Sequence, residues 1–135
     1  MPRLALTLIA CSLAAGPAAG QPTPAAAEFF EKSVRPVLVE RCLACHSAKA
    51  AKGGLRLDSR AALLRGGEGG AVVVPGKPEA SRLIQAVRRT GELAMPPKGE
   101  LPAAEVAALE KWVALGAPWP DQVELAPPDA IARAA

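Results

Sequence analysis

The sequence predicts a small all-α domain. Apolar residues recur at three- and four-residue spacing in two segments, residues 28–42 and 102–115, which is the spacing of a buried helix face. The apolar run at residues 71–76 is too short and too isolated to form a sheet. A chain of 135 residues has room for one domain of about 100 residues, together with an export signal and a tail.

Residues 1–20 are typical of a secretory signal. An apolar stretch at residues 4–10 is followed by small residues, and cleavage is expected near Gly20. The stretch is too short to span a membrane. A second interpretation stays open, because residues 8–11 also resemble a bacterial lipoprotein box, in which Cys11 would carry a lipid anchor. Both interpretations predict a periplasmic or otherwise extracytoplasmic protein.

The domain is expected to cover residues 28–120. The preceding residues 21–27 are rich in Pro and Ala and are expected to form a linker. The first helix should run over residues 28–42 and should kink or restart at Pro36, which has no N–H to donate. Its apolar face consists of Phe30, Val34, Val37, Leu38 and Cys42.

Shorter elements should follow. Residues 47–54 are expected to form a loop, and Asp58 or Ser59 should cap a brief helix that ends at Arg65 before two glycines. Pro78 suits the first turn of another helix. The apolar side chains of that helix are Leu83, Ile84 and Val87.

Residues 102–115 give the clearest helix, which begins at a proline and ends before Gly116. This helix should cross the first one, and Trp112 is large enough to fill the crossing. Residues 121–135 are dominated by Ala and Pro with little to bury, so they are expected to form a disordered tail or a linker.

Residues 42–46 form a C-x-x-C-H motif. Two cysteines three residues apart on a helical turn face the same way, so both thiols can add to the vinyl groups of one haem. The motif therefore predicts one covalent haem c attached to Cys42 and Cys45, with His46 as an iron ligand. His46 is the sole histidine, and the third cysteine, Cys11, lies in the expected export signal.

Two other uses of the motif fit less well. A zinc site normally has four ligands, whereas the mature chain offers two cysteines and one histidine, with Cys45 and His46 adjacent. A thiol redox pair favours a strand-helix-strand context, which the flanking sequence does not provide.

Met95 is the second candidate iron ligand. It is the only methionine besides the initiator, and Pro96 and Pro97 after it hold an extended backbone. A lone methionine is usually core filler. Given the upstream C-x-x-C-H, we expect the Met95 thioether to face the iron opposite His46.

The formal charge of +3, with no aromatic residues among the lysines and arginines, argues against nucleic-acid binding. Basic residues dominate from Lys32 to Arg65, and acidic residues dominate from Glu92 onwards. These regions are either plain solvated faces or a basic rim that steers an acidic redox partner and neutralises haem propionates. The candidates to meet a propionate are Arg56, Arg88 and Arg89.

Several segments together resemble the planctomycete-type cytochrome c domain, over about residues 28–120. They are residues 34–38, 42–46, 53–59, 74–76 and 95–97, and Trp112 followed by residues 116–120. The resemblance implies a helical cytochrome c-like domain wrapped around one covalently bound haem. It also implies Cys42 and Cys45 as attachment points, His46 as proximal ligand and Met95 as distal ligand. Lys77 departs from the pattern, because similar domains often carry a capping Asp there.

The favoured function is single-electron transfer by a His/Met-ligated haem, with a redox protein as partner. Two alternatives stay open: an electron-entry module of a larger secreted oxidoreductase, or a peroxidase-like enzyme with an open iron site. An open-site enzyme would need a distal acid-base residue, and the chain has no second histidine. With aromatic residues at only 3%, the core should depend on the haem, so the apoprotein should be poorly folded.

Overall fold

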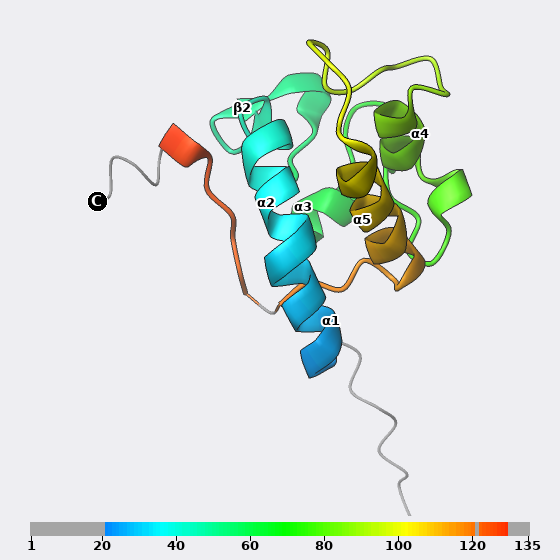
Figure 1. The fold of residues 1–135 in the computed structure, drawn as a ribbon. Coiled ribbons are helices and arrows are strands. Elements are labelled where there is room, and N and C mark those ends of the chain that lie inside the picture. The colour runs from blue at the N-terminus through cyan, green and yellow to red at the C-terminus, as the bar shows by residue number, and fades with distance from the viewer. Residues whose placement is uncertain (1–20, 121, 130–135) are drawn as a thin grey trace, which may run out of the picture.

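Helices are the main regular elements of the computed structural model, which describes residues 21–120 and 122–129 (Figure 1). The predicted all-α class is therefore confirmed, with one small hairpin added. In chain order the elements are α1 (Pro24–Phe29), η1 (Phe30–Val34), α2 (Arg35–Val37), η2 (Leu38–Cys42), β1 (His46–Ser47), β2 (Ala50–Ala51), η3 (Lys52–Gly54), α3 (Arg60–Arg65), η4 (Pro78–Ala80), α4 (Arg82–Arg88) and α5 (Ala103–Ala114). The expected export signal and Cys11 lie outside the described residues.

The elements from α1 to η2 follow one another as a single rod that ends at the C-x-x-C-H motif (Figure 1). The rod begins earlier than expected, inside the presumed linker, because the Thr23 hydroxyl accepts a hydrogen bond from the N–H of Ala26 and Pro24 suits the first turn. Pro36 cannot donate a backbone hydrogen bond, and wide π-helical turns, η1 and η2, lie on either side of it. The rod thus continues through the proline.

A hairpin whose two strands have two residues each lies where the sequence predicts a loop, residues 47–54. β1 pairs with β2 in antiparallel register, with His46 opposite Ala51 and Ser47 opposite Ala50. The pairing turns the chain back directly after the motif, and the N–H of Lys52 donates to the carbonyl of Cys45 at 3.0 Å.

The two middle helices form where their capping residues predict. The Ser59 hydroxyl accepts from the N–H of Ala62 at the start of α3, and Gly66 ends that helix with a positive φ of 75°. The predicted helix after Pro78 is divided at Ser81, whose buried hydroxyl accepts from the N–H of Val74 and donates to the carbonyl of Lys77. The apolar face of α4 is buried as predicted.

An aromatic cluster forms the core where α5 crosses the rod. Phe30, Trp112 and Trp119 are each at most 2% exposed, and the Phe30 and Trp119 ring centroids lie 4.7 Å apart. The indole N–H of Trp112 donates to the carbonyl of Pro118 at 2.8 Å. Trp112 therefore fills the helix crossing, as the sequence predicts.

Part of the expected tail packs on the domain. Leu125 is 3% exposed, and its N–H donates to the carbonyl of Asp58 at 2.7 Å. The indole N–H of Trp119 donates to the carbonyl of Val123 at 2.8 Å. The boundary expected at Pro120 thus leaves out a segment that covers the core, because one apolar side chain among the prolines and alanines finds a buried site.

Within residues 21–120 and 122–129, no helix combines the length and the apolar character needed to cross a membrane.

Candidate haem site

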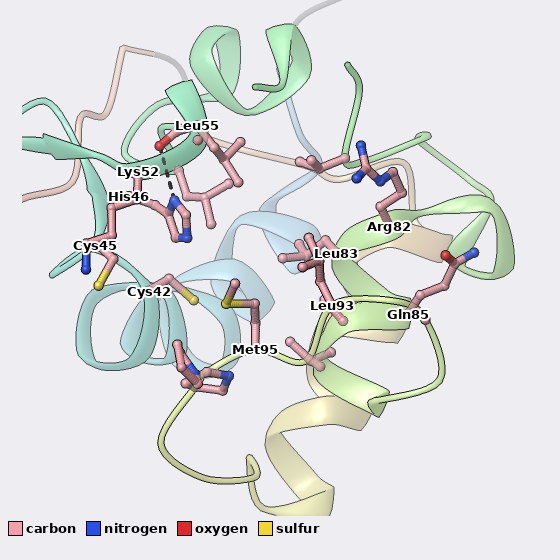
Figure 2. Close-up of a pocket in the computed structure, with 18 of the residues that line it drawn as sticks. Cys42, Cys45, His46, Lys52, Leu55, Arg82, Leu83, Gln85, Leu93 and Met95 are labelled. Carbon is pink, nitrogen blue, oxygen red and sulfur yellow. Dashed lines mark hydrogen bonds between the residues drawn. The ribbon is translucent and has the colours of Figure 1, made fainter. Parts of the chain in front are cut away.

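A cavity of about 580 Å³ lies between η2, the hairpin, α4 and the segment that follows α4 (Figure 2). All four residues that the sequence singles out line this cavity, namely Cys42, Cys45, His46 and Met95. The rest of its lining is mainly apolar and includes Leu55, Leu57, Val72, Leu83, Val87 and Leu101. Folding therefore brings donors from segments about 50 residues apart in sequence to one apolar space.

His46 is held by the segment that follows the hairpin. Its ring Nδ1 lies 3.3 Å from the carbonyl oxygen of Leu55, and its own carbonyl accepts from the N–H of Leu57 at 2.9 Å. A proton on Nδ1 donated to Leu55 leaves Nε2 as the unprotonated nitrogen. Figure 2 shows the ring directed into the cavity, so this arrangement would offer Nε2 to a metal ion there.

Cys42 and Cys45 are both free thiols in the structure. Burial, and to a lesser degree the charge of Glu105 and the neighbouring Cys45, raises the pKa of Cys42 to about 12. In thiol redox sites the surroundings instead lower the pKa of the reactive cysteine, because the thiolate is the nucleophile. The surroundings of Cys42 therefore disfavour a thiol redox pair.

Met95 reaches the same cavity from the segment after α4. Its N–H donates to the carbonyl of Ala86 at 3.0 Å, and the Met95–Pro96 peptide bond is cis. In Figure 2 the Met95 thioether points towards the region where the side chains of His46 and Cys42 also point.

The three arginines expected near a propionate make other contacts. Arg56 pairs with Asp58 at 3.1 Å, Arg88 pairs with Glu110, and Arg89 donates to backbone carbonyls. Among the described residues, the cations that line the cavity are Arg41, Lys52 and Arg82.

Two of these three cations form hydrogen bonds with other segments of the chain. The Arg41 guanidinium makes two 3.2 Å hydrogen bonds to the carboxylate of Glu105 on α5, and these bonds raise the pKa of Arg41. Arg82 donates to the carbonyl of Gly69 at 2.7 Å. Neither contact has a local sequence signal, because each joins residues more than ten positions apart.

Asp58 is a supporting residue that sequence reasoning considered only as a helix cap. Its carboxylate is 2% exposed and accepts from the N–H of Ala48 at 2.9 Å and from Arg56. It thereby ties the hairpin turn after His46 to the segment that orients the imidazole. The only sequence signal for Asp58 was that it can cap a helix, as the adjacent Ser59 also can.

The residues present fit a haem. Two thiols and an imidazole come from residues 42–46, a thioether comes from another segment, and the space between is apolar. Across residues 21–120 and 122–129, no group of three or more His, Cys, Asp or Glu side chains is placed to hold a metal ion.

Comparison with known proteins agrees with this fit. The family model described as Planctomycete cytochrome C matches residues 42–99, a range that contains all four candidate residues. No curated protein and no solved structure matches the chain. By this match residues 42–99 form a Planctomycete cytochrome C domain, and this family implies a covalent haem c that serves electron transfer.

Proposed function

We propose that this chain is an extracytoplasmic monohaem c-type cytochrome that transfers single electrons. Cys42 and Cys45 would hold the haem covalently, and His46 and Met95 would ligate its iron. The observation that carries the proposal is that these four side chains line one mainly apolar cavity. When bound, haem supplies the reversible one-electron couple of its iron.

Each part of the chain has a role in this proposal. The Leu55 carbonyl fixes the tautomer of His46 and makes Nε2 the better donor. Met95 provides a soft thioether, which favours the reduced iron and raises the potential. The apolar lining would limit the access of water to a bound haem and would favour its less charged, reduced state.

The proposal includes an acidic redox protein as partner. Within the described part of the chain, the charged side chains that line the cavity are three cations, Arg41, Lys52 and Arg82, and one carboxylate, Glu92, so the charge beside the proposed haem is net positive. A partner with an acidic surface would be steered towards this edge, and the association rate should fall as salt is added.

Haem staining of a denatured gel and mass spectrometry of the exported protein test the attachment. One haem should stay on the unmodified chain, and replacing both Cys42 and Cys45 with Ala should abolish the retained stain. An exported chain without added haem would overturn the proposal.

Absorption spectra of both oxidation states test the ligation and the function. The unmodified protein should show a low-spin spectrum, the far-red absorption of methionine bound to ferric iron, and reversible reduction. Met95→Ala should lose the far-red absorption and gain carbon monoxide binding in the ferrous state and peroxidase activity. Strong peroxidase activity already present in the unmodified protein would contradict electron transfer at a closed site and favour an enzyme.

A further inference from the structure

We propose that Arg89 is a positioning residue that holds the Met95 loop, residues 91–99, against the cavity. The inference rests on the proposed His46 and Met95 ligation. Arg89 is the residue directly after α4, and its guanidinium contacts the loop on the C-terminal side of Met95.

Two hydrogen bonds carry this inference. Nη2 of Arg89 donates to the carbonyl of Pro96 at 2.8 Å and to the carbonyl of Gly99 at 2.6 Å. A third bond, from the N–H of Met95 to the carbonyl of Ala86, fixes the loop just before the prolines. The loop is therefore held to the end of α4 at several points around Met95.

The loop needs an external donor. Pro96 and Pro97 have no N–H groups, so this part of the backbone cannot bond to its surroundings as a donor. It offers carbonyl oxygens instead, and a guanidinium with several N–H groups can serve two carbonyls at once. Arg89 supplies that donor from a helix end, which is a more rigid support than the loop itself.

The backbone of Arg89 also indicates that its side chain is used. Arg89 has φ 59° and ψ 34°, a left-handed conformation that glycine adopts at lower cost, and it stands at the helix end where glycine is most common. Its Nε is buried and has no hydrogen-bond partner among the described residues, and it forms a long ion pair with the exposed carboxylate of Glu100, at 3.9 Å. The loop carbonyls are thus the closest polar contacts of this side chain.

The neighbouring Arg88 provides a matched control. It carries the same charge one position earlier, but its guanidinium bonds to the carboxylates of Glu79 and Glu110. Replacing Arg88 removes one positive charge from the same helix end and leaves the contacts with the Met95 loop in place.

Imidazole binding to the ferric holoprotein tests the inference, because imidazole must displace Met95 to reach the iron. Arg89→Gly should bind imidazole at least about tenfold more tightly than the unmodified protein, since it loses two hydrogen bonds from a charged donor. Its far-red methionine-to-iron absorption should weaken. Arg88→Gln should stay within about twofold of the unmodified protein, the range of a surface ion pair.

Denaturant unfolding of the same holoproteins separates positioning from general stability. Glycine relieves the left-handed backbone at position 89, so Arg89→Gly should lose no more stability than Arg88→Gln. If the two variants lost stability but bound imidazole equally, Arg89 would be a structural residue only.

The remaining outcomes are also decisive. An Arg89→Gly protein with unmodified imidazole affinity and intact far-red absorption would overturn the inference and leave the Met95 ligation standing. An unmodified protein without that absorption, whose imidazole affinity Met95→Ala does not change, would overturn the proposed ligation itself. If Arg89→Gly yields no holoprotein, Arg89→Lys decides: a rise of about threefold in imidazole affinity supports the inference, and no rise overturns it.

Discussion

At the scale of single residues, Asp58 connects more of the structure than its place in the sequence suggests. Its carboxylate accepts hydrogen bonds from the N–H of Ala48 and from Arg56, and its carbonyl accepts from the N–H of Leu125. The hairpin after the haem motif and the C-terminal segment are thereby joined at one buried residue. The side chain supports His46 without belonging to the motif.

Asp58→Ala should lower the free energy of unfolding of the holoprotein by roughly 3 kcal/mol, because it leaves a buried N–H and an arginine without their acceptor. Urea unfolding measures the loss. Glu124→Ala is the matched control, since Glu124 is the other carboxylate paired with Arg56 and its side chain is 65% exposed. That control should cost about 0.5 kcal/mol or less, and equal losses in the two variants would contradict the role given to Asp58.

At the scale of elements, the segment after α5 acts as part of the domain. Residues 122–125 form hydrogen bonds with Asp58 and Trp119, and Leu125 belongs to the same core as the aromatic cluster. In Figure 1 this segment returns past α1 and α2 after the end of α5.

Leu125→Ala should destabilise the holoprotein by roughly 2–4 kcal/mol, the cost of emptying a buried leucine site. Leu115→Ala is the comparison, because Leu115 is 54% exposed whereas Leu125 is 3% exposed. Thermal or urea unfolding should show a clear loss for Leu125 and a change below about 0.5 kcal/mol for Leu115. A negligible loss for Leu125 would mean that the segment does not pack in solution.

The contact between α4 and α5 has a pH-dependent component. The hydrogen bond from Arg88, followed by its charge, lowers the pKa of Glu110 below the usual 4.5. A carboxylate whose pKa falls on folding stabilises the protein above its unfolded pKa, and this stabilisation is lost as the pH falls through the lower folded value.

Glu110→Gln should therefore cost roughly 0.5 kcal/mol near neutral pH, the order of a solvent-screened ion pair. The difference from the unmodified protein should shrink towards zero in acid. Urea unfolding of both proteins at about pH 7 and about pH 3 measures this trend. A difference that grew on acidification would contradict the direction assigned to Glu110.

At the scale of the whole molecule, one apolar core has two distinct parts. One is the aromatic cluster of Phe30, Trp112 and Trp119, and the other is the cavity lined by the haem motif and Met95. The expectation that the core depends on haem thus applies most directly to the second region. The first is packed by side chains alone.

Apoprotein, made by replacing Cys42 and Cys45 with Ala, should be less stable than holoprotein by roughly 4 kcal/mol or more, because the native state loses a tightly bound group. Hydrogen exchange should show the lost protection concentrated in residues 45–57 and 91–99, two segments that contribute several side chains to the cavity lining. Amides around the aromatic cluster should keep more of their protection. Uniform loss over all helices would indicate that the two regions fold as one unit.

The sequence by itself determined the features that depend on neighbouring residues. The C-x-x-C-H spacing defines Cys42, Cys45 and His46 within one turn, and the ends of α3 follow from the local bonding of Ser59 and Gly66. Periodicity was enough to identify the buried face of α4 and the burial of Trp112 on α5, because each pattern repeats within a few residues.

Only the tertiary structure decided which distant segments meet. It placed Met95 at the same cavity as His46, brought the Arg89 guanidinium to the carbonyls of the Met95 loop, and packed Leu125 on the domain. An arginine or a leucine has the same local signal whether it is solvated or in contact, since its partner lies elsewhere in the chain. Which of these residues come into contact depends on how the rod, α4 and α5 pack, and that packing is a property of the whole fold.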